Sequence, residues 1–137
     1  IQAHRVAMRA AELAQPQWEI SKIYWNTMPR SVIQRGIDKM KEVGSDFMGV
    51  DSADDLPFVK DDEIATTLVS APSYAPKKIA ALKEHPTQMT PDGPFFALSN
   101  ILGIEIVGDE YYTLVKGEKA EPFDANGRET DLFNGVV

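Results

Sequence analysis

The amino-acid sequence predicts an α/β fold. Amphipathic helical segments alternate with short β-prone runs along the 137 residues, and this alternation is typical of α/β proteins. The length suits a single domain. About three strands emerge from the pattern, which is a thin sheet for a free-standing α/β domain. The sequence therefore predicts part of a larger α/β unit.

The first predicted element is a helix over residues 1–14. Its apolar residues recur at three- and four-residue steps and form one stripe, namely Ala3, Val6, Ala10 and Leu13. Pro16 ends the helix because proline lacks the N–H that a further turn needs. No initiator Met and no capping residue precede the helix. We therefore expect the chain to begin inside a longer protein.

The remaining elements follow from periodicity and from the Pro and Gly residues that interrupt it. The order is a buried strand in 21–27, a helix from Pro29 to Gly44, an acidic loop or excursion on the surface over 45–62 and a strand in 62–70. These are followed by a helix between Pro76 and Pro86, a strongly apolar stretch over 95–107, a strand over 109–117 and a tail over 118–137.

Composition excludes several classes of function. The formal net charge of −7 argues against nucleic-acid binding, which needs clustered Lys and Arg. No apolar run is long enough for a membrane span. The sequence contains no Cys, so it has no disulfide framework and no thiolate metal site. These features give a cytoplasmic location as the default expectation.

The sequence alone shows no complete catalytic motif. Its two histidines, His4 and His85, are far apart, and no HxxxH, HExxH or HxH pair is present to begin a zinc site. No nucleophile elbow and no phosphate-binding loop occur. The acidic cluster around Asp54 lacks the ligand spacing of a calcium loop.

Three residues have a structural and a functional interpretation. His85, in KEHPTQM, suits the C-terminal end of a helix dipole, but the same turn could form a pocket wall in which the amide of Gln88 donates and accepts hydrogen bonds. Asn100, in an apolar run, is either a satisfied core residue or a polar group aimed into a pocket. On chemistry alone the structural interpretation is favoured for His85 and Asn100.

Several stretches in order along the chain resemble one family. They are KIYWNTM (22–28), DDEIATT (61–67), KIAALKEHPTQM (78–89), FFALSN (95–100), DEYYTLVKG (109–117) and GRETDLFNG (127–135). Together they resemble the carboxy-terminal half of the N-acetylglucosaminyl-inositol deacetylases of mycothiol biosynthesis, in the LmbE/PIG-L superfamily of zinc deacetylases. The HxTQ turn is shared across the superfamily. The ALSN and ETDL segments favour the deacetylase.

The resemblance implies a Rossmann-like fold and a Zn²⁺ cofactor held by two His and one Asp. Those ligands belong to an HPDD motif and an HPDH motif that precede the helix of residues 1–14 in the family, so we expect them upstream of residue 1. The general base and the histidine that assists the tetrahedral intermediate lie in the same motifs. The resemblance therefore implies no catalytic or metal-binding residue within residues 1–137, and an isolated chain that is inactive.

The resemblance also assigns roles to four residues of this chain. Gln88 and Asn100 are implied to bind substrate. His4 is expected one helical turn after a zinc ligand and would orient that ligand or a neighbouring acid. His85 is likewise expected to support the residues that contact the metal or the substrate without contacting either itself. Pro86 replaces the small residue that is common between His and Thr in this turn.

We expect one domain fragment with three parts: 1–28 as helix and strand of the core, 29–61 as a variable excursion that matches the family poorly, and 62–137 as pocket wall and closing segments. The implied partners are an amino-sugar-inositol substrate and the missing amino-terminal half, with no nucleic acid and no membrane. The alternatives are the mycothiol S-conjugate amidase of the same superfamily, which cleaves an amide on a larger substrate, and a non-catalytic binding module.

Overall fold

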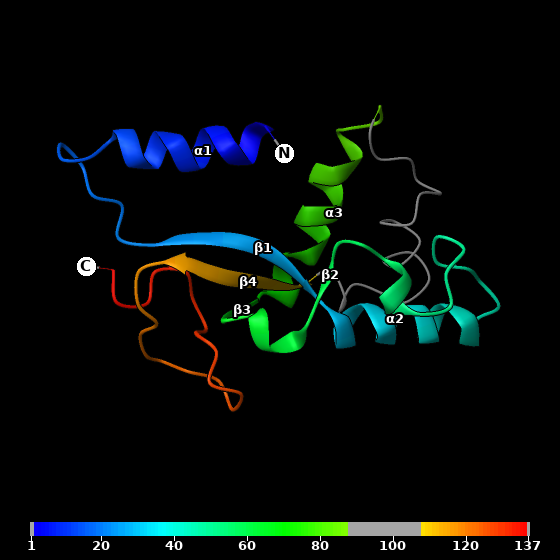
Figure 1. The fold of residues 1–137 in the computed structure, drawn as a ribbon. Helices are drawn as coiled ribbons and strands as arrows, with labels where there is room; N and C mark the ends of the chain where they lie inside the picture. The colour runs from blue at the N-terminus through cyan, green and yellow to red at the C-terminus, as the bar shows by residue number, and fades with distance from the viewer. Residues whose placement is uncertain (1, 88–107, 137) are drawn as a thin grey trace.

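The computed structural model describes residues 2–87 and 108–136 (Figure 1). In chain order its helices and strands are α1 (Gln2–Leu13), β1 (Ile23–Pro29), α2 (Arg30–Glu42), β2 (Val59–Lys60), β3 (Thr67–Ser70), α3 (Ala75–Lys83) and β4 (Asp109–Lys116), with short 3₁₀ turns at Ala53–Asp55, Asp62–Ile64 and Pro72–Tyr74. The predicted α/β class is therefore confirmed. The apolar stretch 95–107 lies outside the described residues.

The strands form one mixed sheet in the order β2-β1-β4-β3. β1 pairs antiparallel with β4 along most of its length, with Trp25 opposite Thr113, and Figure 1 shows these two strands side by side at the centre. β4 also pairs antiparallel with β3, whereas β1 and the two-residue β2 run parallel. Strands far apart in the sequence thus become neighbours, which brings residues near position 25, 67 and 112 into one layer.

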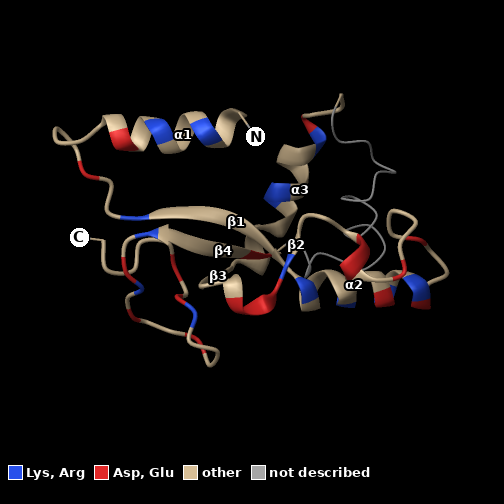
Figure 2. Cartoon of the chain, viewed as in Figure 1, with Lys and Arg blue, Asp and Glu red and all other residues tan. Residues whose placement is uncertain are grey.

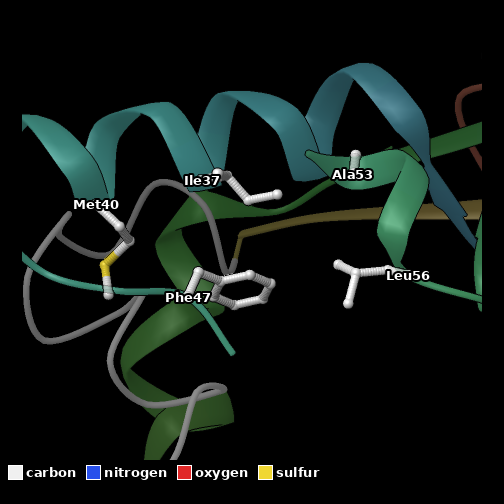
Figure 3. Close-up of a cluster of buried hydrophobic side chains, with 5 residues drawn as sticks. All are labelled: Ile37, Met40, Phe47, Ala53 and Leu56. Atoms are coloured by element: carbon white, nitrogen blue, oxygen red, sulfur yellow. The ribbon is translucent and has the colours of Figure 1, made fainter. Parts of the chain in front are cut away.

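α2 forms the main hydrophobic cluster of the described residues. Its inner face buries Ile37 and Met40, and the segment after it contributes Phe47, Ala53 and Leu56. Figure 3 shows these side chains converging beneath the helix. α2 ends as the sequence predicts: Gly44 adopts a φ of 70°, while the N–H of Ser45 donates to the carbonyl of Met40 at 2.9 Å. This is the glycine-dependent Schellman end of a helix.

The prediction of a loop or excursion on the surface over 45–62 is wrong in its surface placement of the apolar residues. Phe47, Ala53 and Leu56 are buried, with exposed fractions of 7%, 1% and 6%. Gln34 of α2 fixes this segment, because its Oε1 accepts a hydrogen bond from the N–H of Ala53 at 2.8 Å. The acidic side chains still face solvent, so the segment is a packed excursion. Its apolar residues supply much of the core.

The predicted strand over 62–70 begins late. Residues Asp62–Ile64 form a 3₁₀ turn, and β3 covers only Thr67–Ser70. The side-chain carboxylate of Asp62 accepts a hydrogen bond from the N–H of Ser31 at 2.9 Å. This contact with the first turn of α2 holds the acidic turn outside the sheet.

α1 has the predicted position but buries none of its residues. It runs alongside β1 in Figure 1, and its stripe residues Val6 and Leu13 are 66% and 63% exposed. Trp18, in the connection to β1, is 71% exposed. An amphipathic helix normally buries its apolar stripe, so this face of the described residues lacks a covering layer. No helix among residues 2–87 and 108–136 is long and apolar enough to cross a membrane.

Candidate functional site

The two predicted histidines occupy different parts of the fold. His4 lies on α1, and its ring meets the ring of Trp25 on β1 edge-on, with centroids 4.8 Å apart and planes at 68°. This is a favourable aromatic geometry. Trp25 remains 43% exposed. His4 is thus held beside an exposed face of β1.

His85 is the second residue after α3 and is exposed. The helical turn continues to it, because its N–H donates to the carbonyl of Leu82 at 3.1 Å. The structure does not bring His4 and His85 into contact. Gln88 and Asn100, the two predicted substrate-binding residues, lie outside the described residues.

A first polar cluster lies between α3 and β4. The ammonium group of Lys78 pairs with Oε1 of Glu110, and the hydroxyl of Tyr112 donates to Oε2 of the same carboxylate at 2.5 Å. A cavity of about 390 Å³ adjoins the pair, with Val69 and Tyr74 among its walls. One oxygen of Glu110 therefore binds Lys78 of α3, and the other binds Tyr112 of β4, the strand to which Glu110 itself belongs.

Charge and burial shift the pKa values in this cluster. Lys78, and then the hydroxyl of Tyr112, hold the pKa of Glu110 below its ordinary value. Burial and the adjacent carboxylate raise the pKa of Tyr112 to about 12. Glu110 is therefore ionised and Tyr112 is a neutral donor at neutral pH.

A second polar cluster surrounds Glu129, whose exposed fraction is 0%. Its carboxylate accepts four hydrogen bonds: from Lys22 Nζ at 2.5 Å, the Tyr24 hydroxyl at 2.8 Å, the Thr67 hydroxyl at 3.0 Å and the Ala120 N–H at 2.8 Å. The backbone of Glu129 also forms hydrogen bonds with the backbone of Thr66 and of Leu68, the two neighbours of Thr67. All the lone pairs of this buried acid are used, so the cluster links the tail to β1 and β3.

The pKa of Glu129 results from opposing effects. Burial by itself raises the pKa of this carboxyl, but the hydrogen bonds from Lys22, Ala120, Tyr24 and Thr67 outweigh it and leave the pKa below its ordinary value. For Lys22, burial lowers the pKa, and the bonds to Glu129 and Tyr24 more than reverse this. Both charges are therefore stabilised in the folded state.

Sequence reasoning found neither cluster. One usable signal was present, because side chains two residues apart in a strand share a face. Glu110 and Tyr112 have this spacing on β4, whereas Lys22 precedes β1 and the register shifts between Ile23 and Tyr24. The ETDL segment contains Glu129, the most deeply buried acid among the described residues.

The described residues do not fit a metal ion. Across 2–87 and 108–136, no group of three or more His, Asp or Glu side chains converges closely enough to hold one. The carboxylates of Glu110 and Glu129 are already paired with Lys78 and Lys22. Figure 2 shows acidic and basic residues interspersed along α1, α2 and the C-terminal segment.

The mixed sheet with its flanking helices is consistent with part of a Rossmann-like deacetylase fold. No protein-family model matches the chain. The chain is, however, 48% identical over 147 residues to the 1D-myo-inositol 2-acetamido-2-deoxy-α-D-glucopyranoside deacetylase of Geodermatophilus obscurus, an alignment that covers 99% of this chain and 49% of that protein.

Relatives of the same name give the same result. Identity is 45% over 148 residues with the protein of Streptomyces avermitilis, covering 100% of this chain and 49% of the relative. It is 46% over 147 residues with deacetylase 1 of Catenulispora acidiphila, covering 99% and 45%. The chain spans about half the length of these curated relatives. The chain is homologous to about half the length of each of these 1D-myo-inositol 2-acetamido-2-deoxy-α-D-glucopyranoside deacetylases. This homology confirms the predicted resemblance.

Proposed function

We propose that this chain is part of an amide hydrolase that removes the acetyl group of N-acetylglucosaminyl-inositol in mycothiol biosynthesis. The observation that carries the proposal is the identity of 39–48% over nearly the whole chain to proteins that bear this deacetylase name. Identity at this level favours a deacetylase over the S-conjugate amidase. The substrate would be a neutral amino-sugar-inositol, and the acidic net charge of −7 is compatible with it.

The exposed side of α1 supports a partner region within the same protein. The stripe that contains Val6 and Leu13 faces solvent in the described residues, and the relatives are about twice as long as this chain. Burying such a stripe is favourable by about 25 cal/mol per Å² of apolar surface. In our proposal, the other half of the protein covers α1 and the adjacent ring of Trp25.

Four residues of this chain take roles in the proposed site. Gln88 and Asn100 would bind the hydroxyl groups or the acetamide of the substrate, since an amide can donate and accept at once. His4 would orient a metal ligand or a neighbouring acid, and its edge-on contact with Trp25 supports a fixed ring orientation. His85 is tied to the end of α3, which supports a role in shaping the pocket wall.

The Zn²⁺ that the family resemblance implies has no binding group among residues 2–87 and 108–136. In our proposal its ligands come from outside the described residues. The described residues would complete the sheet and hold the pocket wall.

The test uses the natural protein that contains this chain. Purified protein is incubated separately with N-acetylglucosaminyl-inositol and with a mycothiol S-conjugate, and the free amine released from each is quantified. We expect the acetylated disaccharide to be cleaved with the higher kcat/KM. Preference for the conjugate would support the amidase, whereas binding without cleavage of either compound would support a non-catalytic module.

A further inference from the structure

Little packing surface holds α3 against the sheet. Of its nine residues, Ala75–Lys83, only Ala75 is buried. The cavity of about 390 Å³ lies between the start of this helix and the ends of β3 and β4. A cavity contributes no contacts to its walls. Apolar packing against the described residues therefore holds α3 only weakly beyond its first residue.

A charged link spans this loosely packed contact. Lys78, in the middle of α3, pairs with Glu110 on β4, and Tyr112 of the same strand donates to the other oxygen of Glu110 at 2.5 Å. Side-chain exposure is 39% for Lys78 and 36% for Glu110, so the pair is partly shielded from solvent. Because Tyr112 fixes the carboxylate, Lys78 meets an acceptor whose position is already set.

The orientation of α3 is transmitted to His85. The backbone remains hydrogen-bonded past the end of the helix, with Glu84 N–H to the carbonyl of Ala81 at 3.2 Å and His85 N–H to the carbonyl of Leu82 at 3.1 Å. At 1.5 Å per residue, His85 lies about 10 Å along the axis from Lys78. A tilt of about 10° at Lys78 would then move His85 by about 2 Å. Displacements of this size matter in catalysis, since a misplacement of about 1 Å can cost about a hundredfold in rate.

We propose that Glu110 is a positioning residue that, through Lys78, sets the orientation of α3 and so places His85 at the substrate site. This inference rests on the proposed function, because it requires that His85 form part of the pocket wall. Glu110 acts at a distance from the substrate and takes no part in bond making or breaking.

The adjacent lysine supplies a matched control. Lys77 lies on the same helix, is exposed, and places its ammonium group 5.3 Å from the centre of the Tyr74 ring. It has no ion pair with a described residue. Lys77→Met and Lys78→Met therefore remove the same charge, and only the second removes the link to Glu110.

The experiment measures kcat and KM of the natural protein and of its Lys78→Met, Glu110→Gln and Lys77→Met variants on N-acetylglucosaminyl-inositol. Hydrogen exchange of the α3 amides is followed in parallel. We expect kcat/KM to fall at least about tenfold in the first two variants and less than about twofold in the control. Exchange in α3 should accelerate only in the first two. The reversed pair Lys78→Glu with Glu110→Lys should recover part of the loss of either single variant.

Two results would overturn the inference while leaving the proposed function standing: wild-type kinetics in Lys78→Met and Glu110→Gln, or an equal loss in Lys77→Met. Absence of deacetylation by the wild-type protein would instead contradict the proposed function, and this inference would fail with it. If either single variant does not fold, Glu110→Asp replaces it, because Asp keeps the charge and shortens the reach. Wild-type kinetics in Glu110→Asp, together with accelerated exchange in α3, would also overturn the inference.

Discussion

The ammonium group of Lys22 lies 2.5 Å from Oε1 of Glu129, and the side chains are only 7% and 0% exposed. Lys22 immediately precedes β1, whereas Glu129 lies in the C-terminal tail. Because a buried charge is costly without a partner, each residue depends on the other. The pair attaches the tail to the sheet.

Glu129→Gln should therefore destabilise the protein strongly. The substitution keeps the shape of the side chain but leaves Lys22 buried without a negative partner, and such a loss typically costs about 3–5 kcal/mol of unfolding free energy. Urea denaturation of the natural protein measures it. Asp51→Asn serves as the control, because Asp51 pairs with Lys41 at the surface with 93% of its side chain exposed, and it should leave the denaturation midpoint unchanged. An equal effect of the two substitutions would contradict the interpretation of Glu129.

Acid should weaken the fold through Glu129 and Glu110. The folded-state pKa of each carboxyl is below its ordinary value, so as the pH falls the unfolded chain takes up protons first. Their contribution to stability is complete above the ordinary carboxyl pKa of about 4.3. It is lost as the pH falls through that value to the folded-state pKa. In the double variant Glu129→Gln with Glu110→Gln, the unfolding free energy should therefore change less steeply with pH in this acidic range than it does in the wild-type protein. The wild-type slope in that double variant would exclude these carboxyls as its source.

Periodicity identified most of the fold because local sequence determines local structure. Pro16, Pro29 and Gly44 interrupt the pattern near the ends of α1, β1 and α2. It did not show which loop residues are buried, since Phe47 and Leu56 lie among acidic residues and are buried only where α2 meets them.

Long-range pairing also limited prediction of the polar clusters. Glu129 finds Lys22 across 107 positions and Thr67 across 62. A single sequence shows that a Glu and a Lys are present, but it does not show that the tail pairs with β3 within reach of Lys22. For the same reason, the spacing of Lys78 and Glu110 in the sequence does not predict their ion pair, which forms because the fold places α3 beside β4. The roles of Gln88, Asn100, His4 and His85 remain predictions.

The apolar side of α1 should bind hydrophobic ligands when this chain is produced alone. Val6 and Leu13 are more than half exposed, and exposed apolar patches of this kind bind hydrophobic dyes or promote association. Fluorescence of an anilinonaphthalene dye should rise with the 137-residue chain and fall when Leu13 is replaced by Lys. The natural protein should give a weaker signal per molecule if its other half covers α1. Equal signals from both would contradict that cover.

Zinc should bind the isolated chain only weakly. Residues 2–87 and 108–136 contain no converging group of metal-binding side chains, and zinc needs three or four ligands in tetrahedral array. Calorimetric titration with Zn²⁺ is expected to show no stoichiometric submicromolar site. A tight site of one ion per chain would mean that this chain supplies the ligands itself.

Gln88→Ala in the natural protein should impair turnover without loss of metal. If the amide of Gln88 hydrogen-bonds the substrate, its removal forfeits about 1–3 kcal/mol, which corresponds to roughly a five- to 160-fold decrease in kcat/KM. Gln17→Ala is the matched control, because Gln17 is an exposed glutamine in the connection between α1 and β1. Steady-state kinetics on N-acetylglucosaminyl-inositol and metal analysis of the same samples separate the two effects. Loss of metal together with activity would give Gln88 a structural role, and unchanged kinetics would remove it from the site.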